Sequence, residues 1–303
     1  MLKSDLSSNL DKVQRIANAS KLRRMLYHPY RYIKAIAFRK LIYVRTHKET
    51  QAICNTFFGT DINILLPSST DIYLTGGKSH DSEIKLARFL INHLKESNTF
   101  IDVGAHYGYF SLLAAKLVTS SGKVYAFEAA PKTFYVLSKN AKSISNLTAF
   151  NMAVSDTEEE LKFFEFPNLY AEYNTLDVTQ FENEKWFKTH QPTEVTVPSI
   201  ILDDFLTTEK INFQYIKIDV EGAELKVING LTKYLSSYSP TIIMEYLSER
   251  RGNAAHVQAE NKLKKLGYHS HVINSEGFPE KVPSVNDYIS SSNLESDNIV
   301  FIK

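Results

Sequence analysis

Two glycine-containing turns in the sequence each follow an apolar run that carries an acid. In the first, the run Phe100–Val103 contains Asp102, and Gly104, Ala105 and Gly108 follow it. Glycine lets the backbone approach a ligand closely, and the helix expected after the turn directs its N–H groups toward a bound anion. The segment therefore predicts a cofactor-binding turn in which Asp102 pairs with a cationic group. The alternative is that Asp102 only caps the helix.

The next apolar run, residues 123–128, ends in Glu128. In a Rossmann-like unit, an acid at this spacing accepts hydrogen bonds from the hydroxyls of a ribose. The dinucleotide fingerprint G-x-G-x-x-G is absent, because the order here is D-x-G-x-x-x-G. The wider turn favours S-adenosylmethionine (SAM), which has no pyrophosphate, and argues against an NAD-dependent oxidoreductase.

The second turn follows the run Tyr215–Ile218 and brings Asp219 and Glu221 to the expected carboxyl edge of the sheet. Both would face the same side if the strand continued through them, because side chains alternate along a strand. An alcohol that accepts a methyl group gains from a nearby base. These two residues are therefore the predicted catalytic carboxylates, with His106 as an alternative base. The competing interpretation, that the acids only favour a helix N-terminus, suits Glu224 better than Asp219.

Three other side chains are predicted to contact the acceptor. His80 and Glu83 lie in the polar segment 75–83, and Glu245 follows the apolar run 241–244. His80 is a further alternative base, and Glu245 would orient the acceptor. A surface histidine and a strand-capping glutamate are the plain alternatives. No Cys/His cluster has zinc spacing and no acidic spacing compels another ion, so no metal site is predicted.

The segment 166–190 interrupts the alternation of strands and helices with a mixture of aromatic and polar residues. Long insertions without strong periodicity tend to be functional loops, which predicts a lid or an acceptor-binding loop. Trp186 is the predicted acceptor contact, because aromatic faces stack well on the apolar faces of sugars. The alternative is a pair of strands whose aromatic residues belong to the core.

The sequence resembles the FkbM family of SAM-dependent methyltransferases over roughly residues 80–250. The family's blocks D-V-G-A, F-E followed by proline, N-x-A-x-S-D and I-K-I-D-V-E-G-x-E are met by Asp102–Ala105, Phe127–Pro131, Asn151–Asp156 and Ile216–Glu224. The third block adds Asn151 and Ala153 to the predicted cofactor site. Ala129 stands where the family often has proline, which should change the turn and not the chemistry.

The resemblance implies transfer of a methyl group from SAM to a hydroxyl oxygen, typically on sugars or alcohols of glycans and natural products. A nucleic-acid methyltransferase is disfavoured, because residues 219–222 contain no proline pair and no stacking aromatic, and Cys54 lies outside the catalytic region. The predicted partner is a small-molecule or glycan acceptor and not a nucleic acid. A non-catalytic glycan- or lipid-binding module on the same fold is the remaining alternative.

Apolar runs and helical segments alternate from Thr99 to the end of the chain. This alternation predicts an α/β fold with a Rossmann-like, doubly wound, mostly parallel sheet of the class I methyltransferase type. We assign this domain to residues 71–303, and we assign residues 1–70 to a basic helical extension in which residues 1–60 should be helical. Pro29 should divide the extension into two helices.

The segment 20–48 carries nine Lys and Arg residues, with no acid between Lys21 and Lys48. Its apolar residues recur at helical spacing. This pattern indicates either helices packed on the main domain or on a second subunit, or a surface for anionic lipid or a lipid-linked glycan. The chain has a net charge of +1, no apolar leader and no apolar run of membrane length. These features predict a cytoplasmic protein, with peripheral contact to the inner face of the membrane through this segment.

Overall fold

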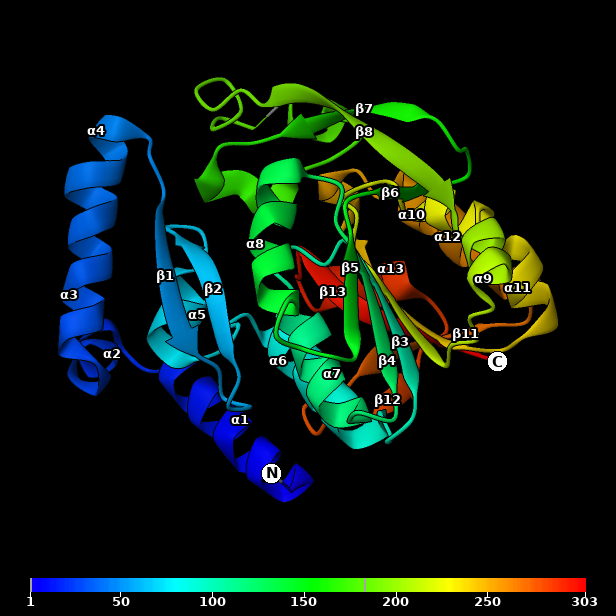
Figure 1. Ribbon diagram of the computed structural model, residues 1–303, viewed down its shortest axis with the longest axis horizontal. Coiled ribbons are helices and arrows are strands. Elements are labelled where there is room, and N and C mark those ends of the chain that lie inside the picture. Colours follow the sequence, from blue (N-terminus) through cyan, green and yellow to red (C-terminus); the bar gives the residue numbers. More distant parts are fainter. Residues whose placement is uncertain (1, 183) are drawn as a thin grey trace.

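The computed structural model describes residues 2–182 and 184–303. Within these residues, eight strands form a central sheet in the order β12-β11-β13-β10-β9-β3-β4-β5 (Figure 1). Six of them run in one direction, while β13 runs antiparallel to β10 and β11, and β12 antiparallel to β11. The strands are β3 Thr99–Val103, β4 Lys123–Phe127, β5 Leu147–Phe150, β9 Tyr215–Ile218, β10 Thr241–Leu247, β11 His269–Ile273, β12 Pro279–Lys281 and β13 Ser296–Ile302.

The sheet has the class I methyltransferase arrangement, so the predicted fold is confirmed. Its register aligns the carboxyl ends of the strands that carry the predicted site. Ile218 at the end of β9 pairs with Val103 of β3 and with Met244 of β10, and Val103 pairs with Phe127 of β4. Residues that directly follow these strands therefore meet at one edge of the sheet, where ligands bind in open α/β sheets.

Helices cover both faces of the sheet (Figure 1). One apolar core joins the sheet to α6 (Asp81–His93), α7 (Tyr109–Val118) and α8 (Pro131–Ala141). A second core joins the opposite face to α9 (Leu202–Glu209), α10 (Glu224–Asn229), α11 (Thr232–Ser237), α12 (Ala254–Lys265) and α13 (Val285–Ser291). α8 begins at Pro131, as its sequence predicts, because the first helical position needs no N–H donor.

A small three-stranded sheet stands beside the carboxyl edge of the main sheet. It contains β6 (Ala153–Ser155), β7 (Glu160–Glu165) and β8 (Thr193–Ile201), in the order β6-β8-β7. The described part of the insertion 166–190 connects β7 to β8 and contains two short 3-10 helices, η2 (Asn168–Tyr173) and η3 (Thr179–Phe181). The described residues of this insertion therefore form no strand pair, but Phe166 and Phe181 are buried, as that alternative expects of the aromatic residues.

The N-terminal region is helical only as far as residue 46. It contains α1 (Lys3–Ala17), α2 (Lys21–Tyr27), α3 (Pro29–Ala37), the π-helix η1 (Phe38–Tyr43) and α4 (Val44–Thr46). Pro29 separates α2 from α3, as predicted. The expectation of helix up to residue 60 is wrong, because β1 (Thr50–Asn55) and β2 (Asp61–Leu66) form an antiparallel hairpin before α5 (Thr70–Thr75). Among the described helices, none is both long and apolar enough to cross a bilayer.

Candidate active site at the carboxyl ends of the strands

A cavity of about 310 Å³ lies at the carboxyl ends of β3, β4, β9 and β10. This volume is at the lower end of the roughly 300–1,000 Å³ range of small-molecule sites. Nine of the predicted site residues line it: His80, Glu83, Gly104, His106, Glu128, Ala153, Asp219, Glu221 and Glu245. The fold therefore brings these nine residues, from both the predicted cofactor site and the predicted acceptor site, to one cavity.

Gly104 allows the turns after β3 and β9 to touch. Its φ of +77° is in the left-handed region, and a Cβ at this position would overlap the carbonyl oxygen of Asp219. Any other residue would push the two turns apart and would strain the backbone. Gly104 thus joins the cofactor turn directly to the predicted catalytic segment.

Glu128 is 6% exposed and lies at the end of β4. Its carboxylate accepts hydrogen bonds from the backbone N–H groups of His106 at 2.8 Å and Ala130 at 2.9 Å. Burial raises the pKa of Glu128 to about 7, although both hydrogen bonds oppose that shift. The carboxylate is held at the cavity wall beside apolar lining residues, which are Phe127, Met152, Ala153, Val154, Phe163 and Leu176. An acid beside an apolar slot suits a ribose joined to a flat base.

Asp102 is 1% exposed and does not line the cavity. One carboxylate oxygen accepts a hydrogen bond of 2.5 Å from Ser111 Oγ on α7, and the other lies 3.7 Å from Lys217 Nζ. The cationic partner of Asp102 in the structure is thus a lysine of the chain itself, and not the ammonium group of the cofactor that the sequence predicts. Asp102 does not cap α7 either, because it accepts a hydrogen bond from the side chain of Ser111 and not from a backbone N–H group of the helix.

Ala105, Gly108 and Asn151 also lie outside the cavity lining, in the turns that support it. Gly108 precedes α7 with a φ of +84°. Asn151 Nδ2 donates hydrogen bonds of 2.9 Å to the carbonyl oxygens of Glu128 and Ala129. Asn151 therefore holds the segment that carries Glu128, and its place in the site is indirect.

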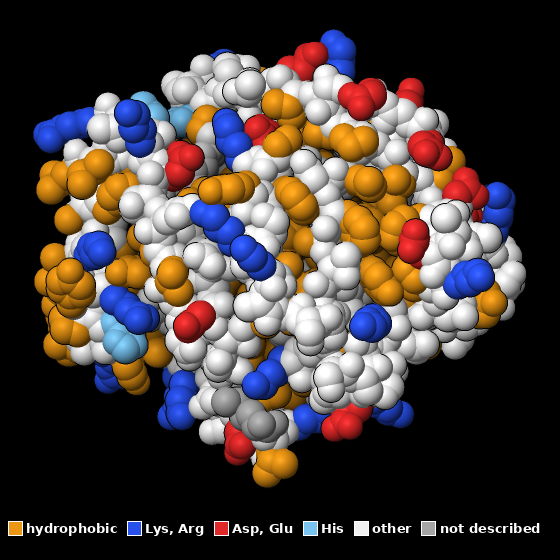
Figure 2. Space-filling model, viewed as in Figure 1, with side chains coloured by type: hydrophobic (Ala, Val, Ile, Leu, Met, Phe, Trp, Pro, Cys, Tyr) orange, Lys and Arg blue, Asp and Glu red, His pale blue; other side chains and the backbone are white. Residues whose placement is uncertain are grey.

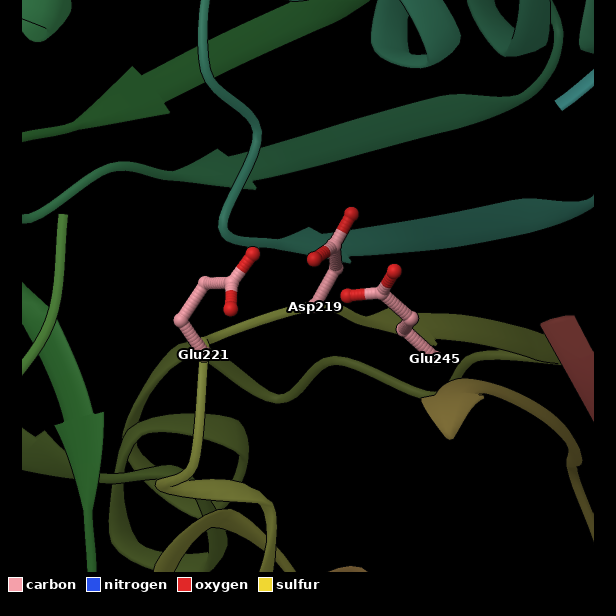
Figure 3. A group of neighbouring side chains, drawn as sticks. All are labelled: Asp219, Glu221 and Glu245. Atoms are coloured by element: carbon pink, nitrogen blue, oxygen red, sulfur yellow. The ribbon is translucent and has the colours of Figure 1, made fainter. Parts of the chain in front are cut away.

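Three carboxylates meet on the opposite side of the cavity. Asp219, Glu221 and Glu245 each offer an oxygen atom within 4.8 Å of the other two, and Figure 3 shows their carboxyl groups converging. The predicted meeting of Asp219 and Glu221 is found, but strand alternation does not produce it. β9 ends at Ile218, and Glu221 is brought round by a turn in which its φ is +50°.

Lys217 sets the charge of this cluster. Its ammonium is nearly buried and lies 2.9 Å from Asp219 Oδ2. Burial alone would raise the pKa of Asp219, but the attraction of Lys217 and hydrogen bonds from Lys217 and Glu245 hold it below its usual value. Burial and the charge of Asp219 raise the pKa values of Glu221 and Glu245 well above the usual value of a glutamate. Asp219 is therefore the acid of the cluster that loses its proton most readily, and the Glu245 carboxyl donates a hydrogen bond to it.

Glu224 is fully buried at the start of α10 and lies behind the cluster. Its carboxylate accepts hydrogen bonds from the backbone N–H groups of Val220 at 3.3 Å and Gly222 at 3.1 Å. It lies 3.2 Å from His256 Nε2. The helix N-terminal interpretation is therefore correct for Glu224, which fixes the turn that presents Glu221.

Lys78 bridges two elements at the mouth of the cavity. Its ammonium lies 3.0 Å from Glu83 on α6 and 2.5 Å from Glu172 on η2. His106 lines the same region, and burial lowers its pKa to about 4, so its imidazole is neutral near pH 7. His80 is exposed, and its Nδ1 lies 2.9 Å from Ser82 Oγ at the start of α6.

Trp186 does not line the cavity but lies behind a residue that does. Its ring stacks on Tyr170 at 4.3 Å and on Tyr173 at 5.3 Å between centroids. Tyr173 lines the cavity, and the Arg251 guanidinium lies over its ring at 5.3 Å. The structure therefore places Trp186 where it positions Tyr173, and a direct contact with the acceptor has no support.

A family model described as the methyltransferase FkbM domain matches residues 102–270, which is more than half of the chain. The chain belongs to the FkbM methyltransferase family. The match begins at Asp102 and covers Glu128, Asp219 and Glu245, so the cofactor turn and the carboxylate cluster both lie within it. This protein is therefore a methyltransferase.

Individual proteins are similar to this FkbM chain over part of its length. Methyltransferase 1 of Beauveria bassiana is 28% identical in an alignment of 187 residues that covers 57% of this chain and 73% of that protein. Hexuronic acid methyltransferase AglP of Haloferax volcanii is 24% identical over 163 residues, 53% of this chain and 61% of AglP. The solved structure of methyltransferase FkbM from Methylobacillus flagellatus is 14% identical, with a TM-score of 0.41 over 78% of this chain and 53% of its own.

The cavity lining of this FkbM chain also includes residues that the sequence does not predict, among them Lys78, Glu172, Tyr173, Lys217 and Arg251. A signal existed for Lys217, because it lies two residues before Asp219 in a strand whose other neighbours are apolar. A charge inside a buried strand needs a buried partner. Lys78 lies in the polar segment 75–83, and Glu172 and Tyr173 lie in the insertion 166–190, so the sequence assigns their segments to the acceptor but not the residues themselves. Of these five, only Arg251 comes from a segment without a predicted role.

Proposed function

We propose that this methyltransferase transfers a methyl group from SAM to a hydroxyl oxygen of a sugar or a related small molecule. The observation that carries the proposal is that one cavity joins Gly104 and Glu128 to the carboxylates of Asp219, Glu221 and Glu245. A donor bound beside Glu128 would present its methyl group toward these acids. Similarity to hexuronic acid methyltransferase AglP supports a sugar as the acceptor.

The residues on the donor side fit SAM. The buried carboxylate of Glu128 can accept hydrogen bonds from ribose hydroxyls, and the apolar wall from Phe127 to Leu176 suits an adenine ring. SAM supplies a methyl group that its sulfonium already activates for displacement. The protein's part on this side is to bind and orient, because holding reactants in line removes much of the barrier.

The residues on the acceptor side can hold a hydroxyl and take its proton. Asp219 is ionised between Lys217 and the proton of Glu245, so its carboxylate can accept a hydrogen bond from the acceptor hydroxyl. Once the oxygen has attacked, its proton becomes acidic and passes to Asp219. The neighbouring polar lining residues can bond further hydroxyls of a sugar, and they are Lys78, Glu83, Arg251 and Asn298.

Cofactor binding gives the first test. Because burial raises the pKa of Glu128 to about 7, this group is protonated below that pH in the free protein. Ribose hydroxyls donate best to the charged form. We therefore expect calorimetry to show S-adenosylhomocysteine binding that tightens as pH rises through about 7. Glu128→Gln should weaken binding by about 1–3 kcal/mol and flatten its pH dependence.

NADH serves as the competing ligand in the same calorimetry. No NADH binding is expected, because the turn after β3 lacks the pyrophosphate-cradling glycine pattern. Tight binding of NADH without binding of S-adenosylhomocysteine would overturn the proposal. Lys132→Gln is the matched control for Glu128→Gln, since its side chain is 73% exposed outside the cavity lining, and it should bind as the wild type does.

A further inference from the structure

The N-terminal arm, residues 21–46, presents a continuous apolar face to solvent. Its members are 55% to 75% exposed and are spaced mostly three or four residues apart, and we call them the outer arm face: Leu22, Leu26, Tyr30, Ile33, Leu41 and Val44. In Figure 2 hydrophobic side chains gather at the edge of the molecule where α2, α3 and α4 lie in Figure 1. An exposed apolar patch of this kind marks an interaction site.

The arm is held in place by its opposite face. Ala35 is 3% exposed and Tyr43 is 2% exposed. Arg31 donates a hydrogen bond of 3.4 Å to the carbonyl oxygen of Tyr73, and the Tyr43 hydroxyl accepts one of 3.2 Å from the N–H of Leu169. The arm therefore packs on the main domain, which is one of the two interpretations that the sequence allows. It leaves the outer arm face uncovered.

Basic side chains border the outer arm face. Seven are exposed, namely Lys21, Arg23, Lys34, Arg39, Lys40, Arg45 and Lys48, and the sequence has no Asp or Glu between Lys21 and Lys48. A face with apolar residues in its centre and long cationic side chains at its sides matches an anionic bilayer surface. The apolar side chains enter the acyl boundary, and the cations reach the headgroups.

A second copy of this chain fits the face less well. Pairing two outer arm faces would bring both sets of seven cations together with no acid of either arm between them. Like charges in such a contact repel each other. On an anionic membrane, by contrast, each Lys or Arg near the headgroups raises the binding constant roughly fivefold. Charge complementarity therefore selects the membrane.

We propose that the outer arm face docks this methyltransferase on the surface of an anionic membrane. The arm lies in the plane of the interface and does not span it. This inference stands apart from the proposed function, because neither the acceptor nor the cavity residues enter it.

The test is sedimentation of the full chain with phosphatidylcholine vesicles, with and without phosphatidylglycerol. The wild type should sediment only with the anionic vesicles and should be released by salt. The triple variant Leu26→Asn, Ile33→Asn, Leu41→Asn should bind at least tenfold more weakly. So should Arg23→Gln, Arg39→Gln, Lys40→Gln, which leaves the apolar residues intact.

Matched control substitutions are made at exposed apolar residues elsewhere: Ile53→Asn, Tyr238→Asn and Phe278→Asn, at positions 64%, 50% and 49% exposed. These should bind as the wild type does. The proposal is wrong if the wild type stays in the supernatant with anionic vesicles. It is also wrong if the arm variants bind unchanged, or if the controls lose binding equally. Sedimentation velocity tests whether a second copy covers the face instead. If the wild type self-associates without binding vesicles, and only the apolar arm variant abolishes this self-association, the face belongs to a second copy and the proposal is wrong.

Discussion

Lys217 determines which acid near the acceptor is ready to take a proton. It pairs with Asp219 at 2.9 Å and stays within 3.7 Å of Asp102. Glu221 and Glu245 have higher pKa values because they are buried beside the charge of Asp219. Asp219 is the member of the cluster whose pKa is lowered, and this residue is the base in our proposal.

Asp219→Asn should lower kcat by roughly 10²–10⁴, because the amide keeps the size of the side chain and removes the proton acceptor. Binding of S-adenosylhomocysteine should stay near that of the wild type. The fold should persist, because Asp102 still offers Lys217 a carboxylate. Steady-state kinetics on a hydroxyl acceptor, calorimetry and a thermal melt measure these three outcomes.

Asp204→Asn is the matched control for Asp219→Asn, since Asp204 lies exposed on α9 beside Lys233. It should retain full turnover. Turnover should also survive EDTA, because the Lys217 ammonium already balances the charge of Asp219 at 2.9 Å. Near-normal turnover of Asp219→Asn would move the base to Glu221, His106 or His80.

The site residues that follow apolar strands could be predicted from the sequence. Asp219 and Glu128 directly follow β9 and β4, and the carboxyl ends of parallel strands meet at one edge. Glu245 lies inside β10, and its prediction rests on the apolar run before it. Asp102 was placed wrongly for a related reason. It lies inside β3, and its side chain meets Lys217 instead of lining the cavity. Sequence spacing cannot distinguish a buried strand residue that faces the ligand from one that faces a buried lysine.

The insertion 166–190 acts as one aromatic unit behind the cavity wall. Tyr170, Trp186 and Tyr173 stack in order, and Phe166 and Phe181 pack edge-on against each other at 5.4 Å. Lys78 ties the unit to the main domain through Glu172. Tyr173 and Glu172 line the cavity, so the unit positions part of its wall.

Trp186→Ala should raise KM for the acceptor severalfold, because Tyr173 loses the ring that supports it. Affinity for S-adenosylhomocysteine should change little, since Trp186 does not line the cavity. Trp186→Phe keeps an aromatic face and should restore most of the acceptor KM. The measurements are KM and kcat for the acceptor, and the affinity for S-adenosylhomocysteine by calorimetry, in the wild type, Trp186→Ala and Trp186→Phe. A joint fall of acceptor use, cofactor affinity and thermal midpoint in Trp186→Ala would instead make Trp186 a residue of the structural core.

Segments with one clear apolar or amphipathic pattern can be predicted from the sequence, and segments that depend on tertiary packing cannot. The run at 215–218 is apolar except for Lys217 and forms β9, and the amphipathic run at 254–265 forms α12. The apolar run 147–154 predicts one strand, but the structure divides it into β5 and β6 after Phe150. The hairpin of β1 and β2 was missed, because its stability comes from packing of Ile62, Ile64 and Leu66 into the core. Local sequence carries little of that information.

At the scale of the whole molecule, the N-terminal region is not a detached arm. α1 packs on α6, where Arg88 bonds Gln14 at 3.0 Å and pairs with Asp11 at 2.9 Å. Lys3 donates a hydrogen bond of 2.7 Å to the carbonyl oxygen of Leu94. The side chains of α1 enter the same core as those of α6 and α7. The boundary at residue 70 remains a prediction, but α1 and the sheet share one core across it.

Leu10 gives the sharpest measure of this shared core, because it is fully buried on α1 among residues of the main domain. Leu10→Ala should lower the free energy of unfolding by about 2–5 kcal/mol, through lost burial and the cavity left behind. Leu26→Ala is the matched control, since Leu26 is 67% exposed on α2, and its effect should stay within about 0.5 kcal/mol. Urea denaturation followed by fluorescence should show a single transition whose midpoint falls for Leu10→Ala alone. If Leu10→Ala leaves the main transition unchanged, α1 unfolds separately and the main domain, with its active site, folds without it.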